Sequence, residues 1–153
     1  MGDSRAGYYS KNNGWKSIIT PINGEDLSTV VPITSDIWHS EKLINTYIES
    51  NIIKDDILAF TLLTDGCERF AFETYKWNEA NQVCKSINLP FKDFYNPIIK
   101  YFNTLYSKTK SDKVLKKEWK NFLKNGTSKI ENEEDDKTLI LGFIHDEFTT
   151  KTF

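Results

Sequence analysis

The chain has 153 residues, of which 39% are hydrophobic and 14% aromatic, and its formal net charge is −2. This length and composition predict one folded domain spanning residues 1–153, and they exclude a disordered chain. The weak negative charge provides no basic field to attract a phosphate backbone, so we expect no nucleic-acid partner.

The N-terminal stretch, MGDSRAGYYSKNNGWK, contains no apolar run of signal-peptide length. No window approaches the ~18 apolar residues of a membrane span. The two cysteines, Cys67 and Cys84, are too few for a disulfide framework, and we interpret them as reduced packing residues. These features predict a cytoplasmic protein without a membrane partner.

Strands are predicted in the first third of the chain. The stretches RAGYY (5–9) and WKSIIT (15–20) flank the polar segment SKNNG, which is typical of a hairpin connection. TVVPITS (29–35) predicts a further strand, with Pro32 at an edge or a bend. LINTYIES (43–50) alternates weakly and is interpreted as another strand.

The clearest strand lies in DILAFTLLTDG (56–66). Its centre is apolar at both odd and even positions, which predicts a strand covered on both faces. Gly66 closes this strand.

Three helices are predicted next. They cover residues 76–87, 90–108 and 111–126, and Pro97 marks either the start of the second helix or a bend in it. We interpret the apolar stripe of the third helix as core packing and its lysines as the solvated face. The stripe consists of Leu115, Trp119, Phe122 and Leu123.

An acidic loop, TSKIENEEDD (127–136), and a last strand, KTLILGFI (137–144), complete the pattern. Strands, then helices, then one returning strand predict an α+β fold rather than alternating α/β. We expect the last strand to pair beside the strand at 57–64, with the helices covering a sheet face.

Acidic residues stand at the ends of these two strands. Asp65 follows one strand, and Asp135 and Asp136 precede the other. Carboxylates at one sheet edge repel each other unless a cation neutralises them, and their oxygens suit Mg²⁺ or Mn²⁺. The alternatives are a simple Asp-Gly turn at Asp65 and a solvated acidic loop at 135–136.

Three stretches together resemble the C-terminal half of the metal-dependent protein phosphatase 2C (PPM-type) family, in its bacterial branch. They are GDSRAGYY (2–9), LLTDG (62–66) and EDDKTLILGF (134–143). The resemblance implies a partial domain: a sandwich of antiparallel β-sheets flanked by helices. It also implies a serine/threonine phosphatase in which a binuclear Mg²⁺ or Mn²⁺ centre activates a water against the phosphorylated protein substrate.

By this resemblance Asp65 and Asp135 would be ligands of the metal pair, and Asp3 would help to hold an additional, weaker metal. Asp3 could equally be a turn residue. The first motifs of the family, a Glu-Asp pair and an Asp-Gly-x-Gly corner, are absent, and Arg69 stands where many relatives have Asp. We therefore expect the isolated chain to be inactive and to need a missing N-terminal half as partner. The alternative is a non-catalytic protein-interaction module derived from the same fold.

Overall fold

The computed structural model of the chain describes residues 4–19, 39–47, 50, 52–80, 82–145 and 147–148. The strand predicted over 29–35 and the candidate ligand Asp3 lie outside these ranges. The described residues form an α+β fold with two antiparallel sheets, which confirms the predicted class.

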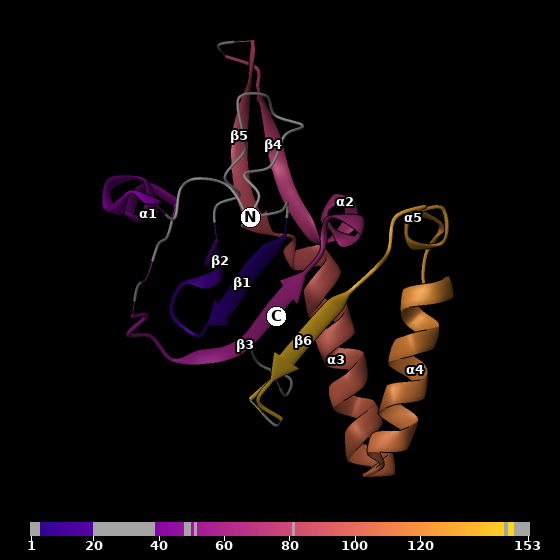
Figure 1. Cartoon of the computed structure of the whole chain (residues 1–153). Coiled ribbons are helices and arrows are strands. Elements are labelled where there is room, and N and C mark those ends of the chain that lie inside the picture. Colours follow the sequence, from indigo (N-terminus) through magenta and orange to yellow (C-terminus); the bar gives the residue numbers. More distant parts are fainter. Residues whose placement is uncertain are drawn as a thin grey trace.

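The larger sheet has four strands in the order β2-β1-β3-β6, each antiparallel to its neighbour (Figure 1). They are β1 (Arg5–Ser10), β2 (Gly14–Ser17), β3 (Ile57–Leu63) and β6 (Leu139–Phe143). The β1–β2 hairpin and the pairing of the last strand with β3 are both confirmed.

A second, two-stranded sheet replaces the helix predicted over 76–87. It consists of β4 (Phe72–Asn78) and β5 (Val83–Pro90), which form a long ribbon extending away from the larger sheet (Figure 1). The helix prediction is wrong because the chain reverses near Gln82, whose φ is 49°. Exposed side chains such as Trp77 and Val83 give the ribbon no buried face for the sequence pattern to reveal.

The strand predicted over 43–50 is also wrong, because residues Glu41–Tyr47 form helix α1. Its start is marked by Ser40, whose carbonyl oxygen accepts a hydrogen bond from the amide of Ile44 at 2.9 Å. The negative charge of Glu41 in the first turn interacts favourably with the positive end of the helix dipole. These start signals outweigh the weak alternation that suggested a strand.

Two long helices follow the ribbon as predicted. α3 (Lys92–Thr109) begins before Pro97 and continues past it, and α4 (Asp112–Asn125) follows α3. Lys110, with φ 48°, ends α3 and lets the chain reverse, so that α4 lies alongside α3 (Figure 1). In the described ranges, none of the helices is both long enough and apolar enough to span a membrane.

The core lies between the larger sheet and α3. Tyr95 and Ile99 of α3 are fully buried there. Thr61 of β3 donates a hydrogen bond to the Tyr95 hydroxyl at 3.2 Å, and the rings of Tyr95 and Trp15 have centroids 4.5 Å apart. These contacts fix α3 on the sheet face that carries Thr61.

The opposite face of the sheet is open within the described residues. Phe60 and Leu62 of β3 are 45% and 42% exposed, and Ile140, which pairs with Leu62, is 50% exposed. The expectation that β3 is covered on both faces is therefore wrong for the part of the chain that the structure describes. The physical reason is that α3 and α4 both pack on the Thr61 side.

Gly7 joins the two sheets because it leaves space for Pro90. A Cβ at Gly7 would overlap Pro90 Cγ and lie 3.0 Å from the carbonyl oxygen of Lys16. Neither the proline ring nor the strand backbone can move freely. We therefore expect Gly7→Ala to lower the free energy of unfolding by about 1–3 kcal/mol, measured by urea denaturation.

Gly142→Ala is the matched control for Gly7→Ala. A Cβ at Gly142 would meet the Phe60 ring, but this ring is half-exposed and can turn towards solvent. We expect a smaller loss of stability than for Gly7→Ala. An equal or larger loss for Gly142→Ala would contradict the role of Gly7 at the junction of the sheets.

Candidate metal corner between two strand ends

The two acidic corners predicted from the sequence meet at one end of the β3–β6 pair. The Thr64 hydroxyl donates a hydrogen bond to the Asp136 carbonyl oxygen and accepts one from the Thr138 amide, both at 3.1 Å. The Thr64 amide in turn donates to the Thr138 carbonyl oxygen at 3.1 Å. A single threonine therefore fastens the TDG turn to the DDKT segment.

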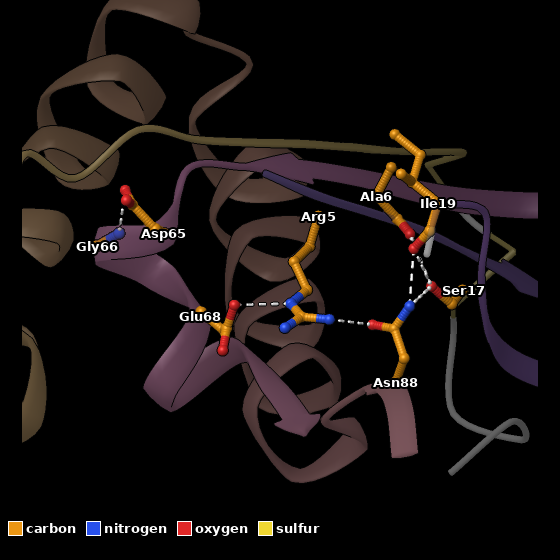
Figure 2. A network of polar contacts seen from close by, with 8 residues as sticks. All are labelled: Arg5, Ala6, Ser17, Ile19, Asp65, Gly66, Glu68 and Asn88. Carbon is orange, nitrogen blue, oxygen red and sulfur yellow. Dashed lines mark hydrogen bonds and ion pairs between the residues drawn. The ribbon is translucent and has the colours of Figure 1, made fainter. Parts of the chain in front are cut away.

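Gly66 allows the two segments to approach each other closely. A Cβ at this position would lie 2.7 Å from the Asp136 carbonyl oxygen and 3.1 Å from Asp135 Cβ. Its amide donates to Oδ1 of Asp65 at 2.9 Å (Figure 2). Gly66, the residue after Asp65, thus lies close to the backbone of Asp136 and to Cβ of Asp135, and the prediction that both acidic segments share one sheet edge is confirmed.

Cations of the chain itself also lie at this corner. Arg69, one turn after Asp65, has its Nη1 4.0 Å from Oε2 of Glu133. Lys137 Nζ donates hydrogen bonds to the carbonyl oxygens of Ile130 and Glu133, at 2.7 and 3.1 Å. Two side chains with positive charge therefore already offset part of the negative charge that a metal ion would neutralise.

The carboxylates of the described residues do not form a complete metal site. No group of three or more His, Cys, Asp or Glu side chains able to hold an ion occurs among them. Asp65 and Asp135 are both exposed, and Asp3 lies outside the described ranges. Asp65 and Asp135 are too few ligands for a binuclear centre, so the metal pair stays a prediction.

A polar network next to the corner was not anticipated from the sequence, in which Arg5 looked like a surface strand residue. Its side chain is only 12% exposed, and its Nε lies 2.8 Å from Oε2 of Glu68 (Figure 2). Its Nη1 donates to Oδ1 of Asn88 at 2.8 Å, and Asn88 Nδ2 donates to Ser17 Oγ and to the Ile19 carbonyl oxygen. The one signal in the sequence was that Arg5 lies on the same face of β1 as Gly7 and Tyr9, because alternate residues of a strand share a face.

This network connects β1, the end of β2, the base of β5 and the short helix α2 (Glu68–Ala71) that follows Asp65. The Arg5 guanidinium also lies over the Phe72 ring, 5.9 Å from its centroid. The turn that carries Asp65 is therefore held from the side of β1 as well as by Thr64.

His145 takes part in a second polar cluster, beyond β6. Its Nδ1 contacts Oδ1 of Asn103, and its Nε2 lies 3.4 Å from Oγ of Ser107. The Ser107 hydroxyl donates to the Asn103 carbonyl oxygen of its own helix at 3.0 Å. The cluster ties the chain just after β6 to α3, and the Ser107 hydroxyl donates within its own helix.

No family model, no curated protein and no solved structure matches this chain.

The two hydrogen bonds of the Thr64 hydroxyl predict a measurable loss of stability when this hydroxyl is removed. Thr64→Val keeps the shape but loses both hydrogen bonds, so we expect stability to fall by about 1 kcal/mol and the Thr138 amide to exchange faster. Urea denaturation and hydrogen exchange measure these effects. Thr138→Val is the control, because the Thr138 hydroxyl makes no hydrogen bond to residues that the structure describes; an equal loss there would contradict the role of Thr64.

The two cysteines differ in exposure and should differ in reactivity. Cys67 is fully buried beneath the corner, and burial raises its pKa from 9.0 to about 11, whereas Cys84 on the ribbon is exposed. The prediction that both cysteines are packing residues is confirmed for Cys67 and wrong for Cys84. Because the folded-state pKa of Cys67 is raised, its contribution to stability is present below pH 9 and decreases as the pH rises towards 11.

Thiol labelling at pH 8 with Ellman's reagent measures this difference. We expect one fast thiol in the folded protein and two after unfolding, because the reactive species is the thiolate and Cys67 is both buried and protonated. Cys84→Ser should leave the folded protein nearly unreactive. A fast thiol that persists in Cys84→Ser would show that Cys67 is accessible and contradict the prediction.

Proposed function

We propose that this chain is the C-terminal part of a metal-dependent, PPM-type protein serine/threonine phosphatase, which hydrolyses phosphoserine and phosphothreonine in a cytoplasmic phosphoprotein. The observation that supports it best is the junction of the acidic corners, where Thr64 Oγ1 donates to the Asp136 carbonyl oxygen at 3.1 Å. This junction unites two of the three stretches on which the resemblance rests, LLTDG and EDDKTLILGF.

In this proposal Asp65 and Asp135 bind Mg²⁺ or Mn²⁺, and Asp3 helps to hold a further, weaker ion. Carboxylates at the ends of paired strands offer such hard cations oxygen ligands on a rigid support. When bound, a pair of ions supplies an activated water for attack at phosphorus. Because the described residues offer too few carboxylates for a pair, the remaining ligands belong to the N-terminal half of the domain.

The open sheet face supports the need for that partner. Phe60, Leu62 and Ile140 form an apolar patch on the side away from α3. An adjoining sheet would remove this surface from water, at roughly 25 cal/mol for each Å² of apolar area. Without this half, the chain would lack both the second set of ligands and the cover for its sheet, and we expect little or no turnover from it alone.

A non-catalytic interaction module is the second candidate function. It is favoured by the pair of Arg69 and Glu133, in which the chain's own cation is 4.0 Å from a carboxylate at the corner. Arg69 repels a divalent ion and provides no ligand atom for one. In this case Asp65 and Asp135 shape the turn and the loop and bind no metal.

Titration with Mn²⁺ distinguishes these two functions. If Asp65 is a ligand, Mn²⁺ at ten times its Kd should stabilise the fold by about 1.4 kcal/mol, and Asp65→Asn should abolish this gain. The readout is the free energy of unfolding at several Mn²⁺ concentrations. Hydrolysis of a phosphopeptide in the same samples should stay at background.

Asp56→Asn is the matched control, because Asp56 is an exposed aspartate at the opposite end of β3 from Asp65. It should leave the Mn²⁺ effect unchanged. No stabilisation by Mn²⁺, or the same stabilisation in Asp65→Asn, would contradict the phosphatase proposal and favour the interaction module. Turnover comparable to that of an intact enzyme would contradict the need for an N-terminal half.

A further inference from the structure

The helix α4 is less well covered than its sequence suggests. Its apolar stripe packs against the core through Trp119, Phe122 and Leu123, yet none of its 14 residues is buried. Trp119 stacks on Phe122, with ring centroids 5.7 Å apart, and both side chains are only partly buried. The part of α4 interpreted as core packing therefore also forms the wall of a surface groove.

This groove runs between α4 and the outer edge of β6. Its first section is an apolar hollow of about 220 Å³, and its second section continues along α4 past Trp119. The hollow is lined by Phe102, Leu115, Lys116, Trp119, Leu141 and Phe143. The second section is lined by Lys116, Trp119, Lys120, Leu123, Lys124 and Lys137.

The edge of β6 that borders the groove has backbone groups directed away from β3. The Thr138 carbonyl oxygen and the Ile144 amide bond to the β3 side, to the Thr64 amide and the Leu58 carbonyl oxygen. Because alternate residues of a strand bond to opposite sides, Leu139, Leu141 and Phe143 direct their amides and carbonyls outward. Consistently, the Leu139 carbonyl oxygen accepts a hydrogen bond from the Trp119 indole at 3.2 Å.

A row of lysines adds positive charge to one wall of the groove. Lys116, Lys120 and Lys124 are exposed and recur every four residues, which places them ~6 Å apart along the helix. No ion pair links them to an acidic residue within the described ranges. Side chains on one face of an extended strand are ~6.6 Å apart, so alternate acidic residues match this spacing.

We propose that this groove binds an extended, acidic segment of a partner protein, which adds as an antiparallel strand to the edge of β6. An apolar side chain fills the hollow beside Trp119 and Phe143, and acidic side chains two and four residues later reach Lys120 and Lys124. The outward amides and carbonyls of Leu141 and Phe143 provide the main-chain hydrogen bonds. The groove reaches the acidic corner only at Lys137, and binding in it does not depend on a metal.

A synthetic peptide of this pattern provides the test. The probe is a fluorescent Thr-Leu-Thr-Glu-Thr-Glu-Thr peptide, and fluorescence anisotropy measures its Kd for the whole chain. We expect saturable binding that weakens as salt increases, since the lysines are exposed. Replacing both glutamates by lysine, or the leucine by serine, should each weaken binding at least tenfold.

Paired charge reversals on α4 locate the site. Lys120→Glu with Lys124→Glu should weaken binding at least tenfold. The control pair, Lys113→Glu with Lys117→Glu, reverses the same number of exposed lysines on the same helix outside the groove and should change Kd less than twofold. Circular dichroism of both variants checks that the helix is retained, and Asp65→Asn should bind the peptide normally.

Four outcomes would overturn the proposal. The first two are no saturable binding, and equal binding by both charge-reversal pairs. The third is concentration-dependent self-association in light scattering that disappears with Lys120→Glu and Lys124→Glu, because the groove would then hold a second copy of this chain. The fourth is preferential binding to phosphatidylserine vesicles over the peptide, lost in the same variant.

Discussion

The register between β3 and β6 is the constraint on which the rest of the structure depends. Leu63 pairs with Leu139, so Thr64 lies beside Thr138 and can reach the Asp136 carbonyl oxygen. A shift of the register by one residue would turn the apolar side chains of β6 to the opposite face. It would also move the TDG turn away from the DDKT segment. The amides and carbonyls of Leu139, Leu141 and Phe143 would then face β3 instead of the groove. One ladder therefore determines both the corner and the groove.

The helices divide the sheet into two unlike faces. On the side of Thr61, α3 brings in Tyr95 and covers the core, and α4 covers it only in part. On the other side, Phe60 and Leu62 remain half-exposed among the described residues. The two open surfaces differ in chemistry: one is a broad apolar face and the other is a narrow groove with lysines on its wall.

The sequence was informative where side chains alternate against a core. The strand at 57–63 and the two long helices were predictable because their apolar spacing follows the buried face. The ribbon was not, because Tyr75, Trp77 and Val83 pack on little and carry no such spacing. The meeting of Asp65 with the DDKT segment was predictable from strand order.

The Arg5 network was not predictable, since its partners lie 63 and 83 residues away along the chain. The incomplete burial of α4 was not predictable either. The spacing of apolar residues shows which side of a helix faces the core, but it does not show how much of that side is buried. Sequence pattern thus gave the arrangement of elements, and the long-range polar contacts required coordinates.

Among the residues that the structure describes, the ribbon of β4 and β5 is held at its base, where Pro90 lies over Gly7 and Asn88 bonds to Arg5. Beyond this point its side chains are mostly exposed and its cohesion comes from its own ladder. A two-stranded ribbon of this kind has little local stability of its own. The outer part of the ribbon can therefore open and close as a separate cooperative unit while the sheet stays folded, whereas its base opens only together with β1.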